Sequence, residues 1–237
     1  FVLYNRAISK IGIVQDIAKE LPAPPVQSYF LCDCWYVSEK IINTFAVQGF
    51  HTIGALKTNR LLYPSGMKKK LSELAAELSV THKNFDLVTV KGKNYYVYRY
   101  ESNLNGIENA IVLFSYPEKA FGKPKALRTF LCMDVSLSTN EILDNYVCRW
   151  PIEVFFRQCK DKLALDSYQI RSAQGIRRYW LIMSFAHYMC VVGTGKVCPF
   201  ETGYRKISDI IQMEKYLTLY QCARECIGFD SFVKVVA

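Results

Sequence analysis

The sequence has no CxxC pair among its nine cysteines, and an odd number of cysteines cannot all pair within one chain. Scattered thiols of this kind are typical of a reducing compartment and argue against a disulfide framework. A zinc site built from His187 and the four C-terminal cysteines is the weaker alternative, because their spacings match no compact structural site: Cys190, Cys198, Cys222 and Cys226. We therefore expect buried free thiols.

The sequence also lacks an apolar run long enough to cross a membrane. The most apolar stretch, "YWLIMSFAHYMCVVG" at residues 179–193, is shorter than the roughly 17 to 25 residues of a spanning helix and contains His187. We predict a buried helix there. The opening "FVLYNRAISK" has neither the charged start nor the small-residue cleavage site of a signal peptide. It does not begin with Met, so we expect the chain to start partway through a larger protein.

Apolar and basic residues are abundant. Of the 237 residues, 51% are hydrophobic and 14% aromatic, which suits a large core in one elaborate domain or two small ones. Thirty Lys and Arg against 21 Asp and Glu give a formal charge of +9. A basic balance of this size favours polyanionic partners, and nucleic acid is the leading candidate.

The hydrophobic periodicity changes along the chain. Helical spacing at 8–21 and 38–50 alternates with short apolar runs at 28–36 and 51–59, which indicates an α/β arrangement around a buried sheet. After a predicted helix at 68–78, four strand-like runs at 86–91, 94–101, 109–116 and 126–136 are separated by turn signals. They predict an antiparallel β insertion. From residue 138 onward the pattern is helical.

The segment "YVCRWPIEVFFRQCK" at 146–160 places charges inside an apolar stretch. On a helix with about 100° per residue and Glu153 at zero, Tyr146 lies near +20°, Arg149 near −40° and Lys160 near −20°. The helix would thus bury one face and present these polar groups from the other.

Two alternatives qualify this interpretation. Pro151 either kinks the helix or restarts it near Trp150, and a restart would invalidate the angles of Tyr146 and Arg149. The stripe is also compatible with an ordinary solvated face that carries local ion pairs.

Tyr146, Arg149, Glu153 and Lys160 reproduce a Y-(2)-R-(3)-E-(6)-K signature, and "RWPIEVFFRQCKDKLALDSYQIRS" around them resembles, almost throughout, the sequence of DDE transposases from bacterial insertion sequences. A second segment, "FLCDCWYVSEKIINTFAVQGFHTIGALKTNR", is similar to the part of this family that carries its second catalytic aspartate, which would be Asp33. The resemblance is strongest over 28–66 and 137–185.

The resemblance implies a ribonuclease-H-like, retroviral-integrase-like α/β core, incomplete at its N-terminal strands, with an antiparallel β insertion before the glutamate helix. The implied division is a partial catalytic core at 1–66 and 137–195, an insertion at 67–136, and a C-terminal helical extension at 196–237. It further implies a bacterial cytoplasmic protein that is nucleoid-associated when bound to DNA, dimerises on DNA and has no membrane partner.

The implied activity is metal-dependent cleavage and strand transfer at transposon ends, with double-stranded DNA as the partner. Two Mg²⁺ ions, replaceable by Mn²⁺, would serve the complete enzyme, because hard cations prefer carboxylate oxygens. Asp33 and Glu153 would be the catalytic metal ligands. The residues expected to hold DNA are Tyr146, Arg149, Arg157, Lys160, Arg171, Arg177 and Arg178.

The resemblance also exposes a gap. The first catalytic aspartate of the family lies on an opening strand upstream of the helix predicted at 8–21, and Asp16, Asp86 and Asp134 are unconvincing substitutes. Two hypotheses follow from the incomplete triad: an N-terminally truncated transposase domain, or a DNA-binding remnant or recruited DNA-binding protein without catalysis.

Overall fold

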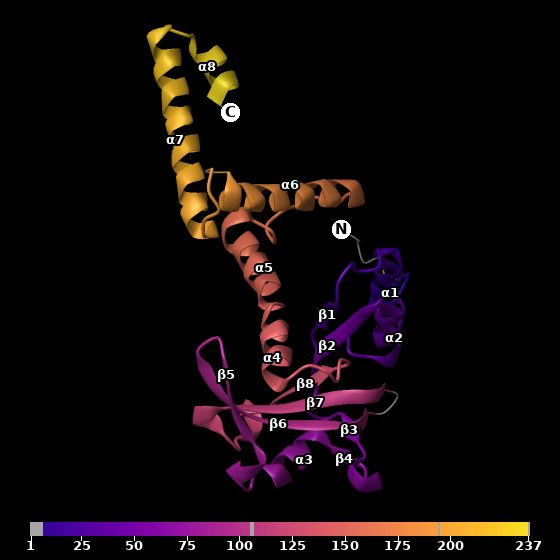
Figure 1. Cartoon of the computed structure of the whole chain (residues 1–237). Helices are drawn as coiled ribbons and strands as arrows, with labels where there is room; N and C mark the ends of the chain where they lie inside the picture. The colour runs from indigo at the N-terminus through magenta and orange to yellow at the C-terminus, as the bar shows by residue number, and fades with distance from the viewer. Residues whose placement is uncertain (1–6, 105–106, 194, 237) are drawn as a thin grey trace. The chain divides into compact units, whose positions relative to one another are not determined.

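The computed structural model describes residues 7–104, 107–193 and 195–236. The chain forms two compact units, one ending at Pro151 and the other beginning at Ile152 (Figure 1). The first contains the sheet and the second is helical. This mixed α/β composition agrees with the predicted fold class.

The first unit is built on an eight-stranded open sheet in the order β1-β2-β8-β7-β6-β3-β4, with β5 paired to β6. The strands are β1 (Ser28–Cys32), β2 (Phe50–Leu56), β3 (Leu61–Leu62), β4 (Lys69–Lys70), β5 (Asp86–Val90), β6 (Lys93–Leu104), β7 (Ile107–Pro117) and β8 (Arg128–Cys132). β1 and β2 are parallel, while the ladders β2–β8, β8–β7 and β7–β6 are antiparallel. β1 therefore lies at an edge of the sheet.

Helices cover both faces of this sheet. The first unit contains α1 (Lys10–Glu20), α2 (Glu39–Val47), α3 (Leu71–Leu78) and α4 (Thr139–Val147), and short 3₁₀ turns η1 (Pro64–Gly66), η2 (His82–Asn84), η3 (Glu118–Ala120) and η4 (Pro124–Ala126). Val112 and Phe114 of β7 belong to the core cluster that includes α3, whereas Ile111 and Leu113 belong to the cluster that includes α4. Since successive side chains point to opposite faces of a strand, β7 is buried on both.

The second unit contains α5 (Trp150–Leu163), α6 (Ala173–Val192), α7 (Phe200–Arg224) and α8 (Phe229–Val236), of which α5 begins two residues before the boundary. Cys159, Leu165 and Met183 form its buried cluster. His187 stacks on Phe200 at 4.6 Å between ring centroids and hydrogen-bonds the side chain of Gln158 at 2.8 Å. His187 is half-buried, and this burial lowers its pKa.

Most predicted elements are confirmed. The four runs between 86 and 136 form β5 to β8, and β8 pairs with β2, so the strands of the predicted insertion and of the predicted core share one sheet. The two-residue strands β3 and β4 were not predicted. The helix at 179–193 is confirmed within α6, but its predicted burial is wrong. Leu181, Ile182 and Phe185 are 62–67% exposed, because α6 packs with only part of its apolar circumference.

Candidate functional site

Asp33 directly follows β1, at the carboxyl end of the two parallel strands. Its carboxylate accepts a hydrogen bond from the backbone N–H of Trp35 at 2.9 Å, and its carbonyl accepts one from Tyr36 N at 3.2 Å. These bonds fold residues 33–36 into a turn in which Asp33 is half-buried. The N-cap of α2 is Ser38, so Asp33 does not cap that helix.

The loop after β1 lies close to the neighbouring strand because β2 has a glycine at the contact. A Cβ at Gly54 would lie 2.5 Å from Cγ2 of Val37 and 2.9 Å from Sγ of Cys32. Both neighbours are buried, so no larger residue fits without displacing them. Gly54 thus sets how the Asp33 turn sits on the sheet.

Tyr146 and Arg149 lie near Asp33 in the first unit. The Arg149 guanidinium is 5.8 Å from the centroid of the Tyr146 ring, and this ring packs on Phe130 at 4.8 Å. Burial raises the pKa of Tyr146, the charge of Arg149 opposes this, and Asp33 adds to it. Burial likewise raises the pKa of Cys32 to about 12, with Asp33 raising it further and Arg149 opposing. The charges of Asp33 and Arg149 therefore both influence the pKa values of Tyr146 and Cys32.

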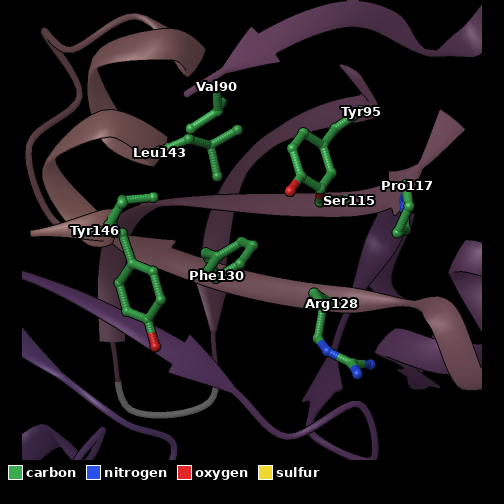
Figure 2. A pocket seen from close by; sticks show the side chains of 9 residues that line it. Val90, Tyr95, Ser115, Pro117, Arg128, Phe130, Leu143 and Tyr146 are labelled. Atoms are coloured by element: carbon green, nitrogen blue, oxygen red, sulfur yellow. The ribbon is translucent and has the colours of Figure 1, made fainter. Parts of the chain in front are cut away.

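An apolar cavity of about 240 Å³ lies beside Tyr146, between α4 and the sheet (Figure 2). Its walls include Tyr95, Phe130 and Leu143, and Arg128 lies at one end. Next to it, a depression shares Tyr95 and Tyr146 and is lined by the cations Lys91, Lys93 and Arg149. Aromatic walls with a basic rim suit a nucleic-acid strand, whose bases stack and whose phosphates are anionic.

The helical unit carries the other predicted site residues. Glu153, Arg157 and Lys160 lie on α5 and are exposed, whereas Phe155, Cys159 and Leu163 pack towards Met183 and Trp180 of α6. Glu153 is in the first turn of α5, where the helix dipole favours a carboxylate. Three further exposed arginines lie at or just before the start of α6: Arg171, Arg177 and Arg178.

The single helix predicted across 146–160 is wrong. α4 ends at Val147 and α5 begins at Trp150, with a turn at residues 148–149. Pro151 lacks the N–H that a continuous helix needs there, and the chain restarts instead. The angles computed for Tyr146 and Arg149 therefore do not apply, whereas Glu153, Arg157 and Lys160 share one continuous helix. Tyr146 is half-buried against the sheet.

Asp134 anchors the loop that connects β8 to α4. The buried carboxylate accepts hydrogen bonds from Gln27 Nε2 at 2.5 Å, Tyr29 OH at 3.1 Å, Ser136 N at 3.0 Å and Ser136 Oγ at 2.6 Å. Burial alone would raise the pKa of Asp134, but the bonds from Ser136 and Tyr29 outweigh it and lower the pKa. Burial, followed by the bond to Asp134, raises the pKa of Tyr29 to about 12.

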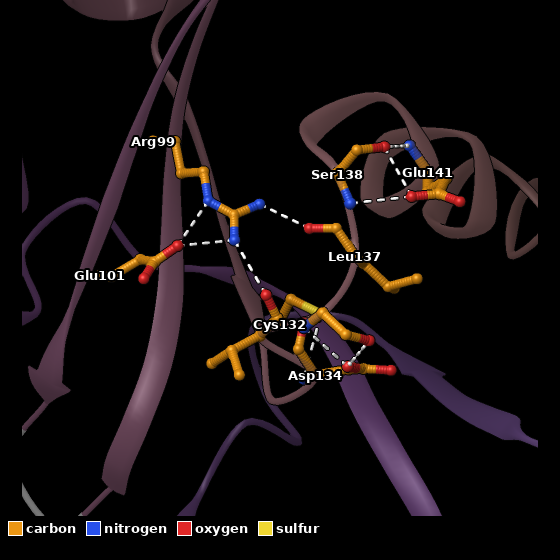
Figure 3. Close-up of polar contacts among 9 residues, drawn as sticks. Arg99, Glu101, Cys132, Asp134, Leu137, Ser138 and Glu141 are labelled. Atoms are coloured by element: carbon orange, nitrogen blue, oxygen red, sulfur yellow. Dashed lines mark hydrogen bonds and ion pairs between the residues drawn. The ribbon is translucent and has the colours of Figure 1, made fainter.

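The same loop is held from its other side by Arg99 of β6 (Figure 3). Its guanidinium donates to the carbonyl of Leu137 at 2.5 Å and to that of Val135 at 3.1 Å, and it pairs with Glu101 at 2.6 Å. Ser138 and Glu141 then form a capping box that starts α4. This network ties β1, β6 and β8 to the helix that carries Tyr146.

A family model for the transposase DDE domain matches residues 5–189. The chain belongs to the transposase DDE domain family. This family acts in DNA transposition, which implies DNA binding, and its members generally use divalent metal ions. A comparison with curated proteins found no match.

The described side chains of this transposase domain were compared with the donor sets that metal ions need. Within 7–104, 107–193 and 195–236, no group of three or more His, Cys, Asp or Glu side chains lies close enough to hold an ion. Asp33 and Glu153 belong to different units. Across the same ranges, each helix is too short or too polar to cross a membrane.

Sequence reasoning did not single out Lys91, Lys93 or Trp35, all of which border depressions of the first unit. The "KGK" sequence of the β5–β6 turn was the only signal for the first two. The sequence shows that Trp35 lies two residues after Asp33, but it does not show that the Trp35 ring is exposed.

Proposed function

We propose that this chain is a catalytic domain of an insertion-sequence transposase of the Tyr-Arg-Glu-Lys subgroup, which cleaves and transfers DNA strands at transposon ends in cut-and-paste transposition. The observation that carries the proposal is the family match over residues 5–189, which includes Asp33 and Glu153. The position of Asp33 supports it, because the carboxyl ends of parallel strands are where α/β folds place reactive groups.

In this proposal the cationic residues hold DNA. Arg149 would bind a phosphate as a planar fork next to Asp33, and the phenol of Tyr146 would add a hydrogen bond. Lys160 would act as a point charge on α5. The exposed arginines Arg157, Arg171, Arg177 and Arg178 would contact the DNA backbone, which fixes position and not sequence.

Asp33 and Glu153 supply carboxylate oxygens, the ligands that Mg²⁺ prefers and Mn²⁺ accepts. Two carboxylates are too few for a pair of ions. We propose that a further carboxylate comes from a strand that pairs with the edge of β1 and completes a ribonuclease-H-like core. A parallel strand there would place its carboxyl end beside Asp33.

The division of the chain remains part of the same proposal: a core at 1–66 and 137–195, an insertion at 67–136 and a helical extension at 196–237. We also propose that the protein works in the bacterial cytoplasm, on the nucleoid, as a dimer on DNA.

The experiment is a nicking assay on supercoiled plasmid with the full reading frame, in Mg²⁺ or Mn²⁺ and with EDTA as the blank. Asp33→Asn and Glu153→Gln should each abolish nicking. Asp16→Asn and Glu214→Gln are matched controls at exposed positions outside the site and should nick normally. Persistent nicking in both site variants would contradict the assignment of Asp33 and Glu153.

A second candidate is a DNA-binding protein without catalysis. The observation that favours it is that the described residues form no cluster of three metal ligands. This candidate predicts binding that weakens steeply with salt, since phosphate contacts release counterions. It also predicts no nicking above the EDTA blank by the unmodified protein.

A further inference from the structure

Trp35 presents its indole to solvent immediately beside Asp33. The side chain is 72% exposed. Single exposed apolar residues are common on soluble proteins, so exposure alone identifies nothing. Three further features of Trp35 set it apart: a fixed backbone, a cation over its ring and a concave setting.

The backbone of Trp35 is fixed by the candidate catalytic residue itself. The Asp33 carboxylate accepts the Trp35 N–H at 2.9 Å, and Ser38 N donates to the carbonyl of Tyr36 at 3.0 Å. Arg60, from the loop after β2, donates to the carbonyl of Val37 at 2.5 Å and closes the loop from the other side. An aromatic ring held in this way loses little entropy when a ligand stacks on it.

A lysine lies over this ring. The Nζ of Lys57 is 4.0 Å from the centroid of the Trp35 indole. Lys57 directly follows β2, and Asp33 directly follows β1, so the parallel pairing of these strands brings the two loops to the same end of the sheet. A cation over one face polarises the ring, and the exposed fraction of Trp35 leaves most of the indole open.

The setting is concave and carries one charge of each sign, from Lys10 and Asp33. A depression of about 440 Å³ is lined by Asp33, Trp35 and Tyr36 on one side and by Ser9, Lys10 and Ile11, at the start of α1, on the other. Its volume suits one nucleotide, because small-ligand clefts begin at about 300 Å³. Aromatic stacking surfaces between cations are the means by which proteins bind single-stranded nucleic acid without reading its sequence.

We propose that Trp35 and Lys57 form a stacking subsite for one unpaired nucleobase of a DNA strand, next to Asp33, with Lys57 neutralising the phosphate of that nucleotide. The inference rests on the proposed function, since it places this base beside the group assigned to strand cleavage. It makes the domain favour single-stranded or frayed DNA over a fully paired duplex at this position. It also makes Trp35 a positioning residue for the strand.

The test measures binding of a single-stranded oligonucleotide of about 12 nucleotides, within the site sizes of stacking grooves, by fluorescence anisotropy. Trp35→Ala should weaken binding about 5- to 150-fold, the range for loss of one base–aromatic stack, and Trp35→Phe should lose less. Lys57→Met should weaken binding and reduce the salt slope by about one charge. Tyr63→Ala, an exposed aromatic outside the depression, is the matched control and should bind like wild type.

A double cycle separates stacking from general charge effects. Oligonucleotides with one abasic position, moved along the strand, should bind wild type more weakly at a single register. In Trp35→Ala the same abasic position should cost nothing further, because the base and the ring are one interaction. Stacking should also quench tryptophan emission in wild type, and the quench should disappear in Trp35→Phe.

The outcomes separate the inference from the proposed function. The stacking subsite is overturned if Trp35→Ala binds DNA with wild-type affinity and no abasic position weakens binding to the wild-type protein. Nicking by the full reading frame can still succeed in that case. Altered oligomeric state in Trp35→Ala, with unchanged DNA affinity, overturns it in favour of a protein occupant. A nicking assay that fails, with the base–ring coupling intact, refutes the catalytic proposal alone.

Discussion

Removing the Asp134 carboxylate should loosen the strand that carries Asp33. Of its four hydrogen bonds, those from Gln27 and Tyr29 join residues more than 100 positions apart, whereas both bonds from Ser136 are local. A hydrogen bond to a charged group contributes about 1.5–3 kcal/mol, so the two long-range bonds bound the effect at about 3–6 kcal/mol. Gln27 is exposed and can bond water instead, which reduces the expected loss for Asp134→Ala to about 2–4 kcal/mol.

The assay is urea unfolding followed by circular dichroism, combined with hydrogen exchange of the peptide that contains β1. Asp134→Asn keeps one acceptor oxygen and should lose about half as much stability, while β1 amides exchange faster in both variants. The control is Asp16→Ala. That carboxylate is exposed and pairs with Lys19 at 3.3 Å on the surface, so its loss should cost less than about 1 kcal/mol. A loss no larger for Asp134→Ala than for this control would refute the reasoning.

The remaining predictions concern pH, packing, capping and thiol reactivity. The folded-state pKa of Asp134 is lowered, so its carboxylate should stabilise the fold fully above the ordinary aspartate pKa of about 3.9. This stabilisation should disappear as the pH falls through the lowered pKa. The measurement is the difference in unfolding free energy between wild type and Asp134→Asn across a series of acidic pH values. Gly54→Ala should lower the unfolding free energy by about 1–3 kcal/mol in urea, because the added methyl group would overlap Val37 and Cys32. An unchanged urea midpoint would show that the loop after β1 moves to accommodate the methyl group. Ser138→Ala should cost about 1 kcal/mol by removing the cap of α4, with Ser138→Asp restoring most of it in the same measurement. Iodoacetamide should label exposed Cys148 in the native protein and spare Cys32, whose thiol is buried with a pKa of about 12, as peptide mass spectrometry would show.

Local patterns were enough to predict the principal strands and helices. The alternation and turn signals between 86 and 136 predicted β5 to β8, and the helical pattern from residue 138 onward predicted the start of α4. These signals are local because caps and turns involve residues three or four positions apart. β3 and β4 have two residues each, and so short a strand has no periodicity to detect.

Contacts between residues far apart in the chain could not be predicted from the sequence. Asp134 was weighed as a substitute catalytic residue and set aside, but its role as the acceptor of Gln27 and Tyr29 depends on chain segments that only the fold brings together. The exposure of α6 could not be predicted either, since composition predicts an apolar helix but not how much of its surface packs against other elements. Pro151 left two alternatives open, a kink or a restart near Trp150, and the restart is confirmed.

The double-sided burial of β7 has a consequence for how the sheet finds its alignment. Ile111, Val112, Leu113 and Phe114 are all fully buried, so sliding β7 by one position would exchange one apolar set for another. In a one-sided strand such a slip exposes the core and is strongly disfavoured, but here hydrophobic burial discriminates weakly between alignments. The choice falls to side-chain shape and to rare polar contacts such as the buried hydroxyl of Thr129, which donates to the carbonyl of Leu56 at 3.0 Å. We therefore expect alignments of similar stability to compete when β7 pairs with β6 and β8, and this competition favours kinetic trapping.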